Sequence, residues 1–305
     1  MNKKLTTMKK ITFLTILFLS FWGGVNAQTY VKFEENGLMK NANAFGALLC
    51  PLGKDKADEV LKTAIDLNVP KKHINGYCEV RADFLCKKLS PIVYGPNCEV
   101  GKIWAFAPSI YTLVSNKKLT TKNPLFKDEN IDWDYHVAPI FAVQNGSKID
   151  TLVIDFSIKD KSFINYKDWL KALNCKDAIY TLTDDSYYLF YTLDGLTLTG
   201  EKYNGYTTPT NLPKIITGHF WYLATTDTTS IPFGLAYNEL AIHLVDKYYN
   251  DPTYRQYQGQ IKSTTKLNEM RKLVSGTLTN LPQELIDECK KYFAEKVDYW
   301  TQQNK

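Results

Sequence analysis

The amino-acid sequence predicts an α+β fold, in which an antiparallel sheet follows two helices and a helical segment closes the chain. Two apolar runs flank Asn145-Gly146, and this dipeptide between apolar runs is the strongest short-range signal for a β-hairpin. Two earlier stretches, 57–67 and 77–89, have the apolar spacing of amphipathic helices. From residue 232 onward, apolar residues again recur at helical spacing.

The first 27 residues have the organisation of a cleaved signal peptide. A basic start (Lys3, Lys4, Lys9, Lys10) precedes the apolar run 11–22 and the cleavage site Val25-Asn26-Ala27. This apolar run is too short to cross a bilayer, and no later run approaches the ~20 residues that a spanning helix needs. We therefore expect an exported protein, secreted or periplasmic, that begins at Gln28 and has no integral membrane span.

The charge of the chain gives no reason to expect a nucleic-acid partner. Removal of residues 1–27 leaves 33 basic and 32 acidic residues, a net charge of +1. The chain has no phosphate-binding loop, no dinucleotide glycine motif and no C-x-x-C, and its four histidines are scattered. We therefore expect neither a cofactor nor a metal ion.

The remaining chain divides into a mixed domain over 28–231, expected to carry the active site, and a helical C-terminal extension over 232–305. Within the first domain the pattern predicts a series of shorter elements. They are strands at 101–107 and 109–114, a polar loop at 115–132, a helix at 166–173, strands within 178–199 and a loop at 203–213.

The hairpin places a histidine opposite an aspartate. If Asn145 and Gly146 are the two central residues of the turn, the numbers of facing residues sum to 291, which pairs His136 with Asp155. Facing residues have Cβ atoms about 4.5–5.5 Å apart. Pro139 complicates this strand, because a mid-strand proline indicates an edge strand or a bulge; in this register it occupies a non-hydrogen-bonded position. A carboxylate at Asp155 can orient the imidazole of His136.

Cys78 lies in the expected first turn of the helix at 77–89 and is the candidate nucleophile. A helix N-terminus and an adjacent imidazolium both lower a thiol pKa, so we expect a reactive thiolate at Cys78. Asp155 holds the ring of His136 in the tautomer that presents a nitrogen to sulfur. The same helix start offers backbone N–H groups to a developing oxyanion.

Each of these three residues also has an ordinary structural explanation. A cysteine of an exported protein is often half of a disulfide, a strand histidine is often a satisfied core residue, and an aspartate that ends a strand is often a turn residue. The hairpin register favours the catalytic interpretation of His136 and Asp155, although a bulge would turn their side chains to opposite faces.

The same residues lie in motifs that resemble the bacterial protein-glutaminases, which are secreted protein-glutamine deamidases with a transglutaminase-like, papain-related fold. The similar segments, in chain order, are Gly76-Tyr77-Cys78-Glu79-Val80-Arg81-Ala82, Asn97-Cys98-Glu99, Trp133-Asp134-Tyr135-His136-Val137-Ala138, Val153-Ile154-Asp155, Asp168-Trp169 and Asn174-Cys175. The similarity spans about 74–175. It implies Cys78 as nucleophile, His136 as base and Asp155 as orienting residue.

The resemblance implies hydrolysis of the side-chain carboxamide of protein-bound glutamine to glutamate and ammonia. The substrate would be a protein or peptide that contains glutamine. Members of the family are made with a long inhibitory propeptide, whereas here only residues 28–77 separate the expected cleavage site from Cys78. Among the other cysteines we expect Cys98 to pair with Cys175.

Three alternatives stay open at this point. A transglutaminase or a cysteine peptidase would use the same three residues, and they differ in the acyl pocket and its access to water. A secreted binding protein could instead present the C-terminal helices, whose aromatic residues Tyr248, Tyr249, Tyr254 and Tyr257 would form a partner surface. A binding protein, however, gives no reason for the triad to be present in register.

Overall fold

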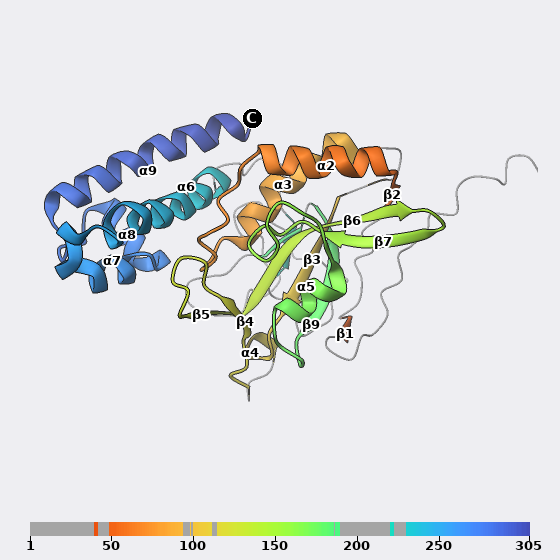
Figure 1. Ribbon diagram of the computed structural model, residues 1–305, viewed down its shortest axis with the longest axis horizontal. Helices are drawn as coiled ribbons and strands as arrows, with labels where there is room; N and C mark the ends of the chain where they lie inside the picture. Colours follow the sequence, from red (N-terminus) through yellow and green to blue (C-terminus); the bar gives the residue numbers. More distant parts are fainter. Residues whose placement is uncertain are drawn as a thin grey trace, which may run out of the picture. The chain divides into compact units, whose positions relative to one another are not determined.

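The computed structural model describes residues 40–41, 49–93, 98, 100–111, 115–185, 187–189, 220–222 and 230–305 (Figure 1). They belong to one compact unit, Val31–Lys305. The expected signal peptide and the expected loop at 203–213 lie outside the described residues. The expected boundary between 231 and 232 stays a prediction. No helix among the described residues is long and apolar enough to cross a membrane.

Within the described residues, seven strands form a mostly antiparallel sheet in the order β1-β9-β3-β6-β7-β8, with β2 running parallel to β6. β6 lies between β3 and β7 and pairs antiparallel with both. The strands of this sheet are β1 (Lys40–Asn41), β2 (Pro51–Leu52), β3 (Gly101–Phe106), β6 (Tyr135–Asn145), β7 (Lys148–Val153), β8 (Ile164–Asn165) and β9 (Ile179–Asp184). Two further pairs are β4 (Leu119–Lys122) with β5 (Asn130–Trp133), and β10 (Tyr187–Leu189) with β11 (Phe220–Tyr222).

The helices fall into two groups along the chain. Those before and within the sheet are α2 (Lys54–Asp66), α3 (Cys78–Val93), α4 (Pro108–Tyr111) and α5 (Tyr166–Ala172). Those after it are α6 (Ser230–His243), continued by a π-helical turn η1 (Leu244–Tyr249), then the 3₁₀ helix η2 (Pro252–Tyr257), α7 (Gln258–Thr264), α8 (Leu267–Ser275) and α9 (Gln283–Gln303). The chain thus combines an antiparallel sheet with helices, which confirms the predicted α+β class.

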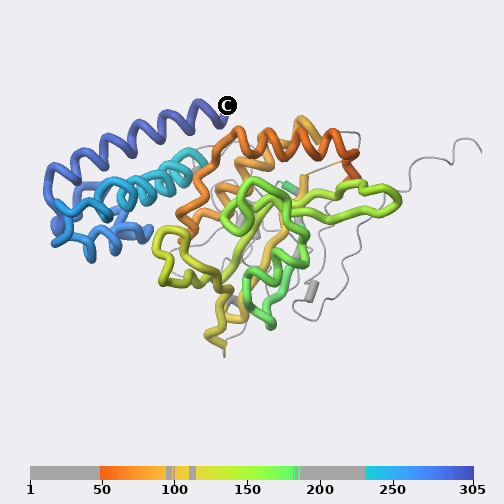
Figure 2. The backbone as a smooth tube through the Cα atoms, viewed as in Figure 1, coloured from red at the N-terminus to blue at the C-terminus, as the bar shows by residue number. Residues whose placement is uncertain are grey.

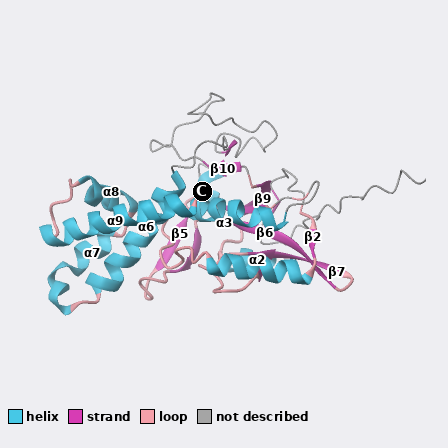
Figure 3. Ribbon diagram, turned by 90° about the horizontal axis from the view of Figure 1, so that it is seen from above, coloured by secondary structure: helices cyan, strands magenta, loops and turns pink. Residues whose placement is uncertain are grey.

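Buried apolar side chains of the described residues form two clusters, one on each side of the sheet. Along β6, Phe141 and Val143 belong to the cluster that includes α2, α3 and the C-terminal helices. Ile140 and Ala142 belong to the cluster that includes α5. This alternation follows from the two-residue period of a strand. In Figure 2 the β6–β7 hairpin is a long green tube, and in Figure 3 α6 and α9 run side by side.

The hairpin at Gly146 forms with a register that differs from the predicted one. Asn145 pairs with Lys148, so the central turn residues are Gly146 and Ser147 and the numbers of facing residues sum to 293. Gly146 has φ +60°, which suits a turn with glycine at its first central position. Since moving the turn by one residue shifts each partner by two, every side chain keeps its predicted face.

Pro139 lies inside the sheet and not at its edge, contrary to prediction. The Ile154 N–H donates to the Pro139 carbonyl at 3.0 Å, so the backbone polar groups of Pro139 face the β7 side. β7 ends at Val153, one residue before that contact. The missing N–H of proline therefore falls where the ladder of hydrogen bonds already ends, and it disrupts no central pairing.

Two local predictions were wrong. Residues 109–111, predicted as strand, belong to the short helix α4, which Pro108 can begin because its missing N–H needs no partner there. The predicted polar loop 115–132 contains β4 and most of β5, a strand pair of mainly polar residues that lacks the alternation on which the prediction relied. The helices at 54–66, 78–93 and 166–172 agree with the predicted ones to within a few residues.

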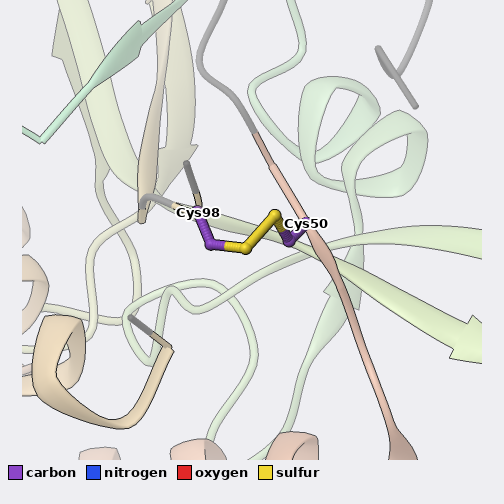
Figure 4. The surroundings of a disulfide bond; sticks show 2 residues. All are labelled: Cys50 and Cys98. Atoms are coloured by element: carbon purple, nitrogen blue, oxygen red, sulfur yellow. A yellow bond between two sulfur atoms is a disulfide. The ribbon is translucent and has the colours of Figure 1, made fainter. Parts of the chain in front are cut away.

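The disulfide joins Cys50 to Cys98, with Cα atoms 5.2 Å apart (Figure 4). The expected Cys98–Cys175 pair was therefore wrong, and Cys175 remains a thiol. The bond closes a loop with a sequence separation of 48 residues that includes α2 and α3. In the chain-entropy model, closing such a loop lowers the entropy of the unfolded chain and so stabilises the folded state by about 4 kcal/mol.

Candidate active site

Cys78 is the first residue of α3, as predicted, and follows an unusual turn. Gly76 has φ +125°, and Tyr77 has φ +57°, a left-handed backbone conformation that residues other than glycine rarely adopt. The Arg81 N–H then donates to the Tyr77 carbonyl at 3.1 Å and closes the first helical turn. The chain therefore enters the helix sharply at Cys78, whose side chain is 5% exposed.

His136 and Asp155 meet as predicted, although not as directly facing residues. His136 Nε2 lies 2.8 Å from Asp155 Oδ2. Asp155 follows the end of β7 and lies diagonal to His136 in the observed register, within reach of a long side chain. Both side chains are buried, at 1% and 8% exposed.

Three further donors keep Asp155 ionised. The Ser157 N–H donates to Oδ1 at 3.1 Å, and the Ser157 hydroxyl donates to the same oxygen. Trp169 Nε1 donates to Oδ2 at 2.8 Å. Burial opposes ionisation, but the electrostatic interaction with the His136 imidazole and the hydrogen bonds from His136, Ser157 and Trp169 hold the pKa of Asp155 well below its usual range. Asp155 is therefore an acceptor, and His136 donates to it through Nε2.

The other ring nitrogen of His136 is available for chemistry. Nδ1 is buried and has no hydrogen-bond partner among the described residues. Because Nε2 carries the proton that bonds Asp155, Nδ1 presents a lone pair. Buried polar atoms normally have partners, so an orphaned Nδ1 in a site that includes a thiol indicates a proton acceptor.

Two tryptophans hold the His136 ring in a stack. The Trp133 ring lies parallel to it, with centroids 4.2 Å apart and planes at 2°. The Trp169 ring stacks on it at 5.6 Å and 20°. Trp133 is itself fixed, because its Nε1 donates to the Ile74 carbonyl at 2.7 Å. The stack restricts ring rotation, and the faces of the indoles favour a positive charge on the imidazole.

The thiol of Cys78 differs from the sequence-based expectation. Burial raises its pKa well above the ordinary value, and the carboxylate of Glu79, which accepts from Sγ at 3.3 Å, raises it further. A hydrogen bond from the backbone of Val137 and the charge of Arg81 act in the opposite direction. The resting state is therefore a neutral thiol and not the predicted thiolate, and a base must remove its proton.

Cys78, His136 and Asp155 line one cavity of about 30 Å³. The cavity also borders Arg81 and Ser157. This volume is large enough for at least one water molecule.

Several residues of the site were not identified from the sequence as functional. They are Glu79, Trp133, Ser157 and Trp169. Ser157 had a local signal, since a hydroxyl two residues after an aspartate often closes a turn on its carboxylate. The two tryptophans had none, because stacking between distant segments depends on the fold. Among the described residues, no group of three histidine, cysteine or acidic side chains could hold a metal ion.

Comparison with known proteins identifies the segment that contains this site. A protein-family model described as "Glutaminase" (Gln_deamidase_2) matches residues 55–173, which include Cys78, His136 and Asp155. No curated protein matches the chain.

Similar solved structures include three protein-glutaminases. The NMR structure of protein-glutaminase from Chryseobacterium proteolyticum is 13% identical, with a TM-score of 0.35, over 52% of this chain and 80% of that one. A crystal structure of protein-glutaminase is 15% identical, with a TM-score of 0.33, over 47% and 78% of the two chains. A pro-protein-glutaminase is 14% identical, with a TM-score of 0.38, over 72% and 66%.

The match to the family model rests on the sequence itself. It covers both the turn at Gly76-Tyr77 before Cys78 and the hairpin that carries His136. Residues 55–173 are therefore similar in sequence to the glutaminase family, in agreement with the resemblance found in the sequence.

Proposed function

We propose that this protein is a protein-glutamine deamidase, which hydrolyses the side-chain carboxamide of protein-bound glutamine to glutamate and ammonia. One observation carries the proposal. Cys78, His136 and Asp155 line a single cavity, inside the segment that the glutaminase family model matches. A cysteine, a histidine with a vacant ring nitrogen and a buried carboxylate are the groups that acyl transfer through a thioester requires.

In the first half of the reaction, the side chain of glutamine acylates Cys78. Nδ1 of His136 accepts the thiol proton as Sγ attacks the carboxamide carbon, and the carbonyl oxygen takes the negative charge. The C–N bond then breaks, His136 returns the proton to nitrogen, and ammonia leaves. A thioester to Cys78 remains.

In the second half, water replaces ammonia. His136 removes a proton from water, the oxygen attacks the thioester carbon, and the C–S bond breaks with return of the proton to sulfur. The products are glutamate and the free thiol. Backbone N–H groups at the start of α3 are suited to stabilise the oxyanion in both halves.

The environment of the site supports a base-assisted attack by a neutral thiol. Because burial raises the pKa of Cys78, the thiolate forms at the cost of a proton transfer. The ionised Asp155 and the faces of Trp133 and Trp169 stabilise the imidazolium that results. Asp155 therefore acts through charge and orientation and does not itself take the proton.

We further propose that the protein is exported after cleavage behind Ala27 and acts on proteins or peptides outside the cytoplasm. The basic and apolar pattern of residues 1–27 supports this. The Cys50–Cys98 disulfide is also more common in exported proteins than in cytosolic ones.

The experiment that tests the function is ammonia release from a glutamine-rich protein by the chain that begins at Gln28. It is compared with Cys78→Ala and with Cys86→Ala, a matched variant at a second buried cysteine of α3. We expect release by the parent chain and by Cys86→Ala, a mass gain of about one dalton per modified glutamine as NH₂ becomes OH, and no release by Cys78→Ala.

The same assay separates the alternatives. Crosslinks between substrate chains, or incorporation of an added primary amine in preference to water, would identify a transglutaminase. Cleavage of the substrate backbone would identify a peptidase. No release together with an inert Cys78 thiol would contradict the enzyme proposal and favour a binding protein.

A further inference from the structure

The turn Gly76-Tyr77 before Cys78 is called the nucleophile turn below. Behind it lies a hydrogen-bonded network of four buried polar residues, called the brace: His73, Arg81, Asn238 and Thr265. His73 and Arg81 belong to the segment around Cys78, whereas Asn238 lies on α6 and Thr265 ends α7. The brace therefore joins residues 165 to 192 positions apart in the chain. It also lies partly outside the segment that the glutaminase family model matches.

Arg81 is the centre of the brace on the catalytic side. Its Nη1 donates to the carbonyl of His73 at 3.2 Å and to that of Gly76 at 3.0 Å. These carbonyls belong to the loop that leads into Cys78. Arg81 thus binds that loop at two points, His73 and Gly76, from a position about one helical turn beyond Cys78.

The tautomer of His73 fixes the direction of every bond in the brace. Its Nε2 lies 3.0 Å from the Thr265 carbonyl, which can only accept, so Nε2 carries the proton and Nδ1 is an acceptor. The amide nitrogen of Asn238 must then be the group 2.7 Å from Nδ1. In this orientation Asn238 Oδ1 accepts from Arg81 Nη1 at 3.1 Å. Asn238 is therefore the link between His73 and Arg81.

A second contact between α6 and the nucleophile turn lies beside the brace. The Tyr77 ring stacks on Tyr237 of α6, with centroids 5.9 Å apart and planes at 3°. At Gly234 a Cβ atom would come within 2.9 Å of the side chains of Tyr77 and Val80. Only glycine allows α6 to approach this closely. Tyr77 is the residue with φ +57°, so α6 packs on the strained residue itself.

We propose that Asn238 is a positioning residue for Cys78, so that the C-terminal helices complete the active site. A left-handed residue before the nucleophile persists only where its surroundings fix it. Arg81 supplies that constraint from one side and α6 from the other. The inference deepens the proposed deamidase function, and the position of Cys78 can also be tested without a substrate.

The test compares Asn238→Ala with Asn304→Ala. Asn304 is also a buried asparagine that joins the C-terminal helices to α3, but it does so at Lys87, whose Nζ donates to Asn304 Oδ1 at 3.2 Å, far along the helix from Cys78. Both variants lose a buried hydrogen-bonding side chain, so both should melt at a lower temperature. This pair separates a general loss of stability from a loss of position at the nucleophile.

We expect Asn238→Ala to lower kcat by between about 10-fold and 100-fold with little change in KM, because a small displacement of a catalytic group affects the chemical step most. Asn304→Ala should retain kcat within about twofold below its melting temperature. Asn238→Asp still offers Arg81 an acceptor but cannot donate to His73 Nδ1, so it should recover only part of the lost kcat. Equal kcat losses in Asn238→Ala and Asn304→Ala would overturn the proposal.

A readout that needs no substrate is the pH dependence of Cys78 alkylation by iodoacetamide in the folded chain. The charge of Arg81 lowers the thiol pKa, so release of Arg81 in Asn238→Ala should move the alkylation profile to higher pH. Asn304→Ala should leave that profile in place. If Asn238→Ala does not fold, Asn238→Ser replaces it, since a serine hydroxyl is too short to link Arg81 with His73.

The two readouts distinguish the two proposals. A shifted alkylation profile in a chain that releases no ammonia would contradict the deamidase function and leave the positioning role intact. Ammonia release with unchanged kcat and an unchanged alkylation profile in Asn238→Ala would leave the function intact and overturn the positioning role.

Discussion

Two buried histidines of this protein, His136 and His73, have almost the same exposure, 1% and 2%, and different surroundings. Both nitrogens of His73 are bonded, Nε2 to the Thr265 carbonyl and Nδ1 to Asn238. His136 bonds Asp155 through Nε2 and leaves Nδ1 without a partner among the described residues. The two histidines therefore differ in the unbonded Nδ1 of His136 and in the carboxylate of Asp155 beside it.

This comparison shows how the surroundings of His136, the proposed base, differ from those of a histidine bonded at both nitrogens. Burial without a counter-charge lowers the pKa of His73 to about 4, so its ring stays neutral and serves as a fixed link. The ring of His136 has an ionised carboxylate at one end, two indole faces and a vacant nitrogen at the other. It can therefore take up a proton within the core, where His73 cannot without loss of a bond.

The largest expected difference between His136 and His73 is in the effect of their substitution on turnover. His136→Gln keeps an amide that can donate to Asp155 but removes the base, and we expect kcat to fall by a factor on the order of 10⁶, as for other nucleophile–base pairs. His73→Gln should lower kcat by no more than about 100-fold, because it affects position alone. Steady-state ammonia release measures both. A similar loss in the two variants would remove the distinction.

The second largest effect on kcat is expected at the carboxylate of Asp155. Asp155→Asn keeps the size of the side chain but removes the charge that orients and stabilises the imidazolium of His136, and we expect kcat to fall by about 10⁴-fold. Asp246→Asn is a suitable control, since its pair with Lys72 is exposed on both sides. Activity within a factor of ten of the parent chain would show that Asp155 is a structural residue.

The third expectation concerns stability and pH. His73 has a pKa of about 4 in the folded chain, against an ordinary value of 6.5, so the unfolded chain binds more protons between these values and the stability of the fold decreases as the pH falls. From pH 7 to pH 5 we expect a loss of about 2 kcal/mol in the free energy of unfolding. The lowered pKa of Asp155 acts below this window, as pH falls past 3.8.

Urea unfolding at several pH values tests this expectation, with His73→Gln as the comparison. The variant should lose most of the slope between pH 7 and pH 5, because glutamine does not titrate. An equal slope in both chains would assign the pH dependence to other groups and contradict the assigned state of His73.

The smallest effect on kcat is expected at the indole of Trp169. Trp169→Phe keeps a ring against His136 and removes the N–H that donates to Asp155 at 2.8 Å. We expect kcat to fall by about tenfold, in line with the loss of one hydrogen bond to a charged group. Trp104→Phe, another fully buried tryptophan outside the cavity lining, is the control. An unaltered kcat in Trp169→Phe would limit this residue to packing.

The sequence predicted that Cys78, His136 and Asp155 would come together because the position of each depends on local pattern. Cys78 begins a helix with clear apolar spacing, and His136 and Asp155 flank one hairpin. The exact register was wrong because Asn145-Gly146 and Gly146-Ser147 both make acceptable two-residue turns, and only the packed sheet selects between them. The error preserved the faces, so the pair was still found.

What the sequence did not predict depends on contacts between distant segments. The neutral state of Cys78 follows from burial and from Glu79, neither of which a helix-start argument includes. The Cys50–Cys98 bond and the stack of Trp133 on His136 require the folded arrangement. The same is true of Asn238, whose role near Cys78 has no local signature.

The most direct test of the central claim, that Cys78 attacks glutamine with His136 as its base, is mass spectrometry of the chain after rapid acid quenching during turnover of a short blocked glutamine peptide. The account predicts an adduct on the Cys78 peptide equal to the substrate mass minus ammonia, absent from His136→Gln and from Cys78→Ala. Turnover that persists in Cys78→Ala, or an adduct on any other residue, would contradict it.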